Sequence, residues 1–306
     1  MRGPAGLTKG YVTMRRVLIL LGVFLVPVAV FGALVLADRS FGLVGRGFDY
    51  VVSVDLPEPG DQASLPKVEG PIDATRPLVV IDPGHGGKDP GAGTAGTHEK
   101  DLTLALALAL RDELLRGGGV RVALTRSDDR YILLGERSVI ARRLGADLFI
   151  SIHADSTEVS TGAVGATVYT LSAKGSNEVA ERMAARENAA DSINGVTIKD
   201  YGDNVSAVLV DLSQRRAQAG SETFAGLILR EGRGQMPFKE AEPQSAAFAV
   251  LKAPEVPSVL FESGYINNPD DVSRLTSPAG RLTFAQVLDR AIRVFFARTT
   301  SPANGA

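Results

Sequence analysis

From Leu78 onwards, short runs rich in β-branched residues alternate with longer stretches of helical character. The short runs are bounded by turn residues and predict strands, at 78–82, 120–125, 147–153, 163–172, 246–251 and 258–264. The longer stretches combine Ala, Leu and charged residues and predict helices, at 101–116, 135–146, 270–275 and 278–298. Strands separated by helices indicate an α/β domain over 78–298 with a largely parallel sheet.

An uncharged apolar run occupies residues 17–37, ahead of this domain. Its 21 residues are enough to span a bilayer as a helix, although Pro27 would bend it. Basic residues upstream predict that 1–16 stays in the cytoplasm and that the rest of the chain lies outside. The sequence Val35-Leu36-Ala37 also permits signal cleavage, but the run is long for a signal peptide. We slightly favour an uncleaved transmembrane anchor.

Three further segments differ from the domain in composition. Residues 38–77 are rich in Pro, Gly and charge without a sustained period, which predicts a flexible linker. Residues 299–306 predict a disordered tail, and about 175–232 is polar and helix-prone.

Composition narrows the chemistry that the domain can perform. The formal net charge of −2 gives no basic excess for nucleic acid. The absence of Cys excludes disulfides, thiolate nucleophiles and cysteine–zinc sites. Any site built on imidazole must use the three histidines, His85, His98 and His153.

Two of these histidines follow predicted strands. His85 lies just past the first strand and His153 ends the third. Right-handed crossovers can seat these two strands side by side, and open α/β sheets collect function at the carboxyl ends of their strands. Two imidazoles at neighbouring strand tips predict a pair of metal ligands. Either His98 or Glu99 could supply a third, and chemistry alone leaves that choice open.

The remaining notable groups are a loop and a carboxylate. Residues 83–98 are dense in glycine, which would let the backbone pass close to a metal and a polymeric substrate. Glu262 lies near the end of a predicted buried strand, where an unpaired carboxylate is costly. It is either a structural, salt-bridged residue or a general base beside metal-bound water.

Ordered blocks along the whole domain resemble those of a known family. They include VVIDPGHGGKDPGA, HEKDLTL, TRSDD, LFISIHADS, GATVYTLS, ENAAD, VLVDLSQ, FAVLKAP and VPSVLFESGYINNPDD. This chain resembles the zinc-dependent N-acetylmuramoyl-L-alanine amidases, the bacterial cell-separation amidases. The resemblance implies a mixed sheet of about six strands flanked by helices. It also implies that one Zn²⁺ is bound by His85, Glu99 and His153, with Glu262 as the catalytic carboxylate.

The expected activity is hydrolysis of the amide between N-acetylmuramic acid and L-alanine in peptidoglycan, in the bacterial periplasm or at the outer face of the inner membrane. A zinc peptidase or deacetylase acting on another envelope substrate would share the metal features. A wall-binding regulator that has lost catalysis should lack at least one site residue, and none is missing here.

Division-linked members of this family carry a helical insertion that covers the zinc until an activator protein displaces it. Residues 175–235 resemble that insertion, and Glu187 is the expected plugging carboxylate, with Asp191 second; a solvated helix face is the alternative. Relatives often have a His before the FAVL block, where Lys239 is nearest here, so a substrate contact there would use an ammonium. The 38–77 segment is too short for the N-terminal wall-binding domain of many relatives. Localisation would therefore depend on the membrane segment or on partners.

Overall fold

The computed structural model describes residues 65–94, 96–156, 162–193, 196–197, 207–253 and 255–300, together with 17, 19, 21–23, 25–31 and 33. The chain divides into two units, Met1–Asp61 and Gln62–Ala306. In the first unit, the described residues between 17 and 33 are helical, and the rest of the predicted 17–37 segment lies outside the described residues. Within the described part of the chain, no helix is both long enough and apolar enough to cross a membrane.

The second unit is built on a six-stranded sheet with the order β4-β1-β5-β10-β6-β9. The strands are β1 (Leu78–Pro83), β4 (Arg121–Leu124), β5 (Leu148–Asp155), β6 (Thr167–Leu171), β9 (Gln244–Ala246) and β10 (Ser258–Tyr265). All neighbouring pairs are parallel except β10 with β6. The predicted α/β class, the largely parallel sheet and the adjacency of the first and third strands are therefore confirmed.

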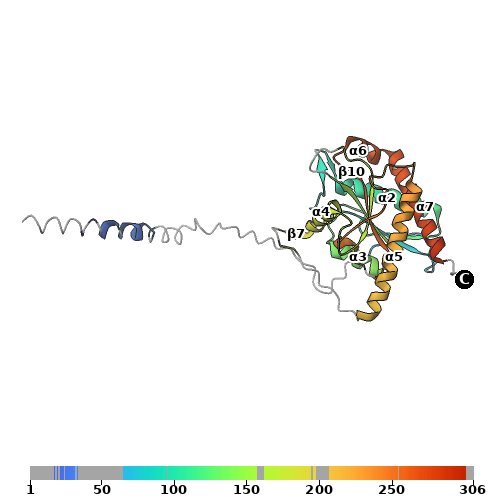
Figure 1. Ribbon diagram of the computed structural model, residues 1–306, viewed down its shortest axis with the longest axis horizontal. Coiled ribbons are helices and arrows are strands. Elements are labelled where there is room, and N and C mark those ends of the chain that lie inside the picture. Colours follow the sequence, from blue (N-terminus) through green and yellow to red (C-terminus); the bar gives the residue numbers. More distant parts are fainter. Residues whose placement is uncertain are drawn as a thin grey trace, which may run out of the picture. The chain divides into compact units, whose positions relative to one another are not determined.

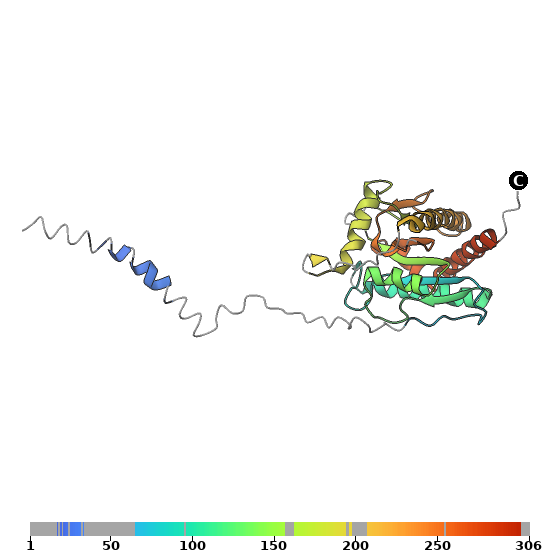
Figure 2. The same ribbon diagram turned by 90° about the horizontal axis from the view of Figure 1, so that it is seen from below.

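Helices cover both faces of this sheet (Figure 1). They are α2 (Glu99–Gly117), α3 (Leu134–Arg143), α4 (Glu178–Asn188), α5 (Ala207–Gly232), α6 (Pro269–Thr276) and α7 (Pro278–Thr300), with 3-10 turns η1 (Ala189–Asp191) and η2 (Ala249–Leu251). Two small ladders pair β2 (Gly93–Thr94) with β3 (Thr97–His98), and β7 (Ser192–Ile193) with β8 (Val196–Thr197). In Figure 2 the teal and green elements of the first half lie below the gold to red elements of the second half, in keeping with the strand order.

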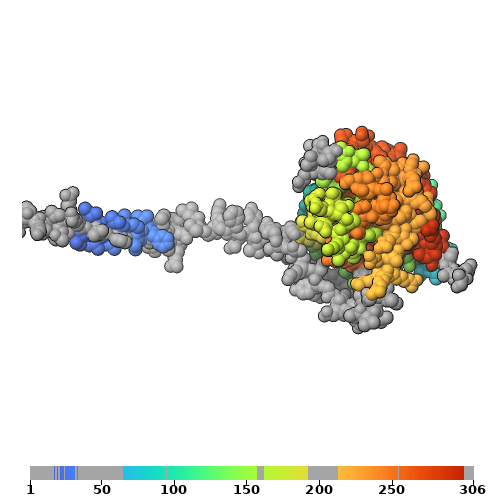
Figure 3. Space-filling view, in the orientation of Figure 1, coloured from blue at the N-terminus to red at the C-terminus, as the bar shows by residue number. Residues whose placement is uncertain are grey.

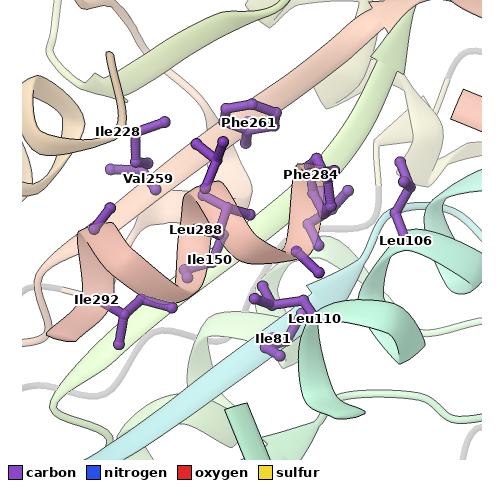
Figure 4. Close-up of a cluster of buried hydrophobic side chains, with 14 of the residues drawn as sticks. Ile81, Leu106, Leu110, Ile150, Ile228, Val259, Phe261, Phe284, Leu288 and Ile292 are labelled. Atoms are coloured by element: carbon purple, nitrogen blue, oxygen red, sulfur yellow. The ribbon is translucent and has the colours of Figure 1, made fainter. Parts of the chain in front are cut away.

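Alternation along the strands sends side chains into two separate cores, because successive strand residues point to opposite faces. Val79 and Ile81 pack with α2, α5 and α7, whereas Leu78 and Val80 pack with α3, α4 and η2. The α2/α5/α7 core is the larger of the two, and Figure 4 shows part of it, with Phe261 of β10 above Phe284 of α7. The α3/α4 face is the one on which the candidate site lies.

The strand expected at 246–251 is wrong. The ladder β9 covers Gln244–Ala246, after which the chain turns into η2. Phe248, Val250 and Leu251 are buried in the α3/α4 core rather than on a strand. A short apolar run has the same hydrophobic pattern in a strand and in a buried turn, so the periodicity could not distinguish them.

The linker expected over 38–77 ends earlier than predicted. Within the described residues, Glu69 exchanges two backbone hydrogen bonds with Val122 of β4, at 2.8 and 2.9 Å. Because β4 is the outer strand of the sheet, its free edge offers hydrogen-bonding groups that this segment satisfies. Residues 38–64 of the predicted linker lie outside the described residues.

The expected insertion over 175–235 consists of two different parts. Helix α4 lies over the candidate site, as described below. Helix α5, in contrast, contributes Phe224, Ala225 and Ile228 to the large core, all fully buried, and packs against α7. The second half of the segment is therefore part of the domain's framework. Side chains of the first residues of α5, and residues 198–206, lie outside what is described.

Candidate metal centre and active site

His85 reaches the site through an unusual backbone conformation. It lies two residues beyond β1, and its φ of 59° makes it the only non-glycine residue with positive φ in the described part of the chain. Its Nδ1 lies 2.7 Å from a carboxylate oxygen of Asp89, four residues on. This contact orients the ring so that Nε2 faces the interior, which is the usual arrangement behind a metal-binding histidine.

His153 and Glu99 come from the neighbouring strand and from the start of α2. His153 lies near the carboxyl end of β5, beside β1. The Glu99 carboxylate is 1% exposed and accepts hydrogen bonds from the backbone N–H of Ala92 at 2.8 Å and of Ala154 at 2.9 Å. These bonds fix its position between the glycine-rich loop and β5.

Two glycines make this convergence possible. A Cβ at Gly84 would lie 2.5 Å from the ring of His153. A Cβ at Gly91 would lie 2.6 Å from the ring of His85 and 2.7 Å from Glu99. Glycine at these two positions therefore lets the loop lie directly against the side chains of His85, Glu99 and His153.

Four ligand atoms converge at one point: Nε2 of His85, Nδ1 of His153, Oε1 of Glu99 and Oε2 of Glu187. Glu99 Oε1 lies 3.1 Å from each imidazole nitrogen. Glu187 Oε2 lies 3.3 Å from His85 Nε2 and 3.1 Å from His153 Nδ1. Ligand atoms bound to a tetrahedral ion at 2.0–2.1 Å lie about 3.3–3.4 Å apart, which matches these separations.

The donor set also suits a metal on chemical grounds. All four residues are buried, and their ligand atoms lie within 4.8 Å of one another. Nε2 of His85 is buried without a hydrogen-bond partner among the described residues. Two imidazoles and one or two carboxylates are typical of zinc sites. The residues present therefore fit a bound Zn²⁺.

Charge is concentrated and balanced within this cluster. Burial opposes the charged form of every member, but the neighbouring opposite charges outweigh it. Glu187 and Glu99 raise the pKa of His153 to about 10, and His85 and His153 lower the pKa of Glu99 to about 2. The pKa of His85 is raised and that of Glu187 lowered for the same reason. These opposite charges stabilise one another across the cluster, and a bound ion would take the place of the imidazole protons.

Glu262 lies beside this cluster on β10, in register with His153 on β5. It is 1% exposed, and neither carboxylate oxygen has a hydrogen-bond partner within the described residues. Burial raises the pKa of Glu262 well above its usual range, and the carboxylates of Asp155 and Glu187 add to this. A buried carboxyl group without a salt bridge is unlike a structural residue and resembles one kept available for proton transfer.

Helix α4 covers this side of the sheet with a narrow buried stripe. Ala180, Met183, Ala184 and Glu187 follow the i, i+3, i+4, i+7 spacing and are buried, while the opposite side is exposed. Figure 3 shows that exposed side as a yellow-green surface. The stripe places the Glu187 carboxylate against the two imidazoles, where the sequence prediction expected a plugging carboxylate.

Arg186, the neighbour of Glu187, ties α4 to the end of β5. Its guanidinium donates to the carboxylate of Asp155 at 2.9 Å and to the carbonyl of Ser156 at 2.6 Å. Sequence reasoning missed this contact, and it also missed Asp89 behind His85. The available signal for Asp89 in the sequence was its position in the glycine-rich loop, four residues after His85.

The structure corrects the prediction for Asp191. Its carboxylate accepts hydrogen bonds from the Tyr131 hydroxyl at 2.7 Å and from the Leu134 N–H at 2.9 Å, at the start of α3. It is therefore committed to anchoring η1 and lies outside the four-residue cluster. His98, the alternative to Glu99, is exposed on β3 and is not part of the cluster.

Lys239 lies near the site without belonging to the cluster. Its ammonium donates to the hydroxyl of Tyr265 at 2.8 Å, and that hydroxyl interacts in turn with Asp155. The position therefore joins the network around Asp155 and Arg186. A substrate contact by Lys239 stays a prediction.

Comparison with known proteins agrees with this site. The profile of the family described as N-acetylmuramoyl-L-alanine amidase matches residues 79–294. AmiA of Escherichia coli K12 is 40% identical over 221 residues, which cover 72% of this chain and 76% of AmiA. AmiC of Escherichia coli O6:H1 is 36% identical over 225 residues, covering 72% of this chain and 54% of AmiC, so the chain matches about half of that relative.

Among solved structures, AmiC2 of Nostoc punctiforme is similar, with a TM-score of 0.51 and 29% identity over 72% of this chain and 98% of that chain. The sheet, the buried cluster and these matches lead to one assignment. The chain belongs to the N-acetylmuramoyl-L-alanine amidase family, whose enzymes act on the peptidoglycan of the bacterial cell wall.

Proposed function

We propose that this chain cleaves the amide bond between N-acetylmuramic acid and L-alanine with one Zn²⁺ bound by His85, Glu99 and His153. The observation that carries the proposal is the convergence of these three buried side chains, with separations that suit a tetrahedral ion. Bound zinc would supply a water of lowered pKa and would polarise the amide carbonyl.

The chain's own groups then provide orientation and proton transfer. Asp89 holds the ring of His85, and the backbone N–H groups of Ala92 and Ala154 hold Glu99. Glu262 accepts the proton of the attacking water at a carboxylate oxygen and delivers it to the nitrogen of the leaving L-alanine. Its raised pKa suits a group that must both accept and donate a proton.

The same geometry supports an inhibited resting state. Glu187 adds a fourth ligand atom to a set in which a catalytic zinc keeps one position open for water. With Glu187 in place, that position is taken. We propose that a partner protein, linked to cell division, binds the helical segment and displaces α4. Separation of daughter cells is the process in which such control would be needed.

Location follows from the N-terminal segment in this proposal. The apolar run at 17–37 would place the catalytic domain on the outer side of the inner membrane, where its substrate lies. Fractionation of tagged cells after an alkaline wash tests this point. Retention in the membrane with an intact N-terminus supports an anchor, and a soluble, shortened chain indicates a cleaved signal instead.

The decisive test of the activity is digestion of purified peptidoglycan by the full-length protein, followed by mass spectrometry. We expect intact stem peptides with free L-alanine amino termini, and we expect them to disappear with chelator or with Glu262→Gln. Glu187→Ala should increase the rate without activator. A point variant is preferable to deleting 175–235, because α5 carries part of the large core.

The products also separate the competing activities. Cleavage within the stem peptide would indicate a zinc peptidase, and loss of acetyl groups would indicate a deacetylase. If Glu187→Ala binds zinc but releases no stem peptides with free L-alanine amino termini, the amidase proposal is wrong.

A further inference from the structure

Three consecutive carbonyl groups beneath the site receive an unusual number of side-chain hydrogen bonds. They belong to Pro83, Gly84 and His85, the segment that carries the first predicted ligand. Pro83 O accepts from two guanidinium groups, at 2.9 and 2.8 Å. Gly84 O accepts from a guanidinium at 2.8 Å and from a hydroxyl at 2.9 Å, and His85 O accepts from a guanidinium at 2.9 Å. The whole turn is therefore held from below by side chains.

Arg126 provides two of these bonds and extends the contact to a second predicted ligand. Its Nε donates to Pro83 O, and its Nη2 donates to Gly84 O. The same Nη2 donates to Lys100 O, also at 2.8 Å. Lys100 follows Glu99, so one guanidinium nitrogen bridges the backbone beside His85 and the backbone beside Glu99.

Arg137 provides the other bonds and connects the turn to β5. It donates to Pro83 O, to His85 O and to the carboxylate of Asp82 at 2.9 Å. Asp82 also accepts from the Ser151 hydroxyl at 2.7 Å, two residues before His153. The two arginines thus donate directly to the backbone at His85 and beside Glu99. Through Asp82 and Ser151, Arg137 is also connected to the strand that carries His153.

Burying this pair is expensive. Arg126 and Arg137 are 0% and 1% exposed, and of the two only Arg137 has a carboxylate within hydrogen-bond reach among the described residues. Burial and the nearby charge of Arg137 lower the pKa of Arg126 to about 10. Apolar side chains would fill such a space at lower cost, so the guanidinium groups need another reason to be there.

The conformation of His85 supplies that reason. A left-handed φ is disfavoured for a residue with a Cβ and persists only where its surroundings enforce it. A guanidinium presents several donors in one rigid plane and can hold several carbonyls at fixed angles, which an ammonium cannot. Binding sites need this kind of support to keep ligand atoms in place before the ligand arrives.

We propose that Arg126 and Arg137 are positioning residues that hold the turn Pro83–His85, and the start of α2, in the geometry that directs His85 and Glu99 to a common point. This inference rests on the proposed metal site for its functional meaning. Its physical content, a preformed turn, exists in the metal-free protein and can be measured there.

The test compares full-length Arg126→Lys and Arg137→Lys with Arg293→Lys. Arg293 is the matched control, because it donates to the carbonyl of Gly118 at 2.9 Å, just past the C-terminal end of α2 and away from the cluster. Hydrogen exchange of the metal-free proteins, read from peptides covering 83–87 and 99–104, is the first measurement. Zinc affinity by competition with a chromophoric chelator is the second, and the absorption spectrum with Co²⁺ is the third.

We expect Arg126→Lys to accelerate exchange in both peptides by at least tenfold, while a peptide from β10 exchanges as in the wild type. Zinc affinity should fall by about 10–100-fold, as is typical when support behind a ligand is lost, and the Co²⁺ spectrum should change. Arg293→Lys should leave all three unchanged. If Arg126→Lys does not fold, Arg137→Lys carries the same test, with exchange expected to rise at 83–87.

Two results would overturn the inference. One is unchanged exchange at 83–87 in both variants. The other is faster exchange spread evenly over the whole domain, which would mean that the arginines only stabilise the fold. Failure of the wild type to bind zinc would refute the proposed function instead, and the exchange comparison would still decide whether the arginines hold the turn.

Discussion

Replacing Arg186 with Ala should release α4 and raise the activity of the protein in the absence of any partner. Arg186 donates to Asp155 and to the carbonyl of Ser156 at the end of β5. It does not touch the four converging ligand atoms themselves. Its guanidinium lies 3.1 Å from Oε1 of Glu187, whereas the converging atom of Glu187 is Oε2. The substitution therefore weakens the closed position of the helix without removing a predicted ligand or the predicted base.

The size of the effect follows from these contacts. Hydrogen bonds to charged groups contribute about 1.5–3 kcal/mol each when well shielded from water. The Arg186 side chain is 40% exposed, so water screens its hydrogen bonds to Asp155 and Ser156. Their combined contribution to the closed position of α4 falls to about 1–2 kcal/mol. A change of that size shifts the equilibrium between closed and open α4 by about 5–30-fold, because each 1.4 kcal/mol is a factor of ten.

The assay is the initial rate of dye release from labelled peptidoglycan by the full-length protein, with zinc content measured in parallel. Arg182→Ala is the control, because Arg182 lies on the same helix and, among the described residues, pairs with the exposed Glu178 alone. We expect a 5–30-fold higher rate for Arg186→Ala and no change for Arg182→Ala. A rate within twofold of the wild type, at equal zinc content, would refute the reasoning.

Three further predictions concern stability. Although burial favours its neutral form, Arg137 and two hydroxyl groups keep the pKa of Asp82 below its usual value; its contribution is thus present above about pH 4 and lost as the pH falls further. Asp82→Asn should cost about 3–5 kcal/mol at neutral pH by leaving Arg137 unpaired, and urea unfolding should show this cost shrinking below about pH 4. Asn268 caps α6 by accepting from two backbone N–H groups and donates to the carbonyl of Ala163 at 2.9 Å, so Asn268→Ala should lower the free energy of unfolding by at least about 1 kcal/mol; an unchanged stability would contradict the cap. Phe224 is fully buried against Phe295, and Phe224→Ala should cost about 3–5 kcal/mol. A loss below 1 kcal/mol would mean that α5 is not part of the framework.

The predictable part of this protein is the part governed by sheet geometry. Runs of β-branched residues predict the strands, and the helices between them predict right-handed crossovers. These crossovers can place the first and third strands side by side. His85 follows the carboxyl end of β1 and His153 lies near the carboxyl end of β5, so their proximity could be predicted before any distance was known. Glu262 could be assigned to the same edge by the same argument.

The parts that could not be predicted depend on tertiary contacts between distant segments. Chemistry alone does not distinguish His98 from Glu99, because both side chains can bind a metal. The start of α2 decides which of the two turns inward. Asp191 and Glu187 are both carboxylates on one polar segment, and only the packing of η1 against α3 separates them. Arg126 and Arg137 belong to patterns that predict solvated charge, whereas the fold buries both.

The contacts that hold α4 explain why this helix is suited to being displaced from the site. His153 and Glu262 project from the sheet face that α4 covers, so in the proposed mechanism the helix moves before a polymer reaches them. Its buried apolar stripe consists of Met183 and two alanines, whereas α7 buries four large side chains or more. Burying one large apolar side chain stabilises a structure by about 1.5–3 kcal/mol, so apolar packing holds α4 only weakly.

Polar contacts provide the rest of its attachment, through Arg186, through Glu187 and through Asn188, which bonds to the backbone of Ala247 and Ala249. Water can replace most of these contacts when the helix leaves, so each costs only about 0.5–1.5 kcal/mol to break. Glu187 is the exception, because its carboxylate leaves two buried imidazole rings that water reaches only after opening. A partner that displaces α4 therefore needs to overcome chiefly the attraction of this one side chain, and segments of such low local stability are the ones that regulated proteins move.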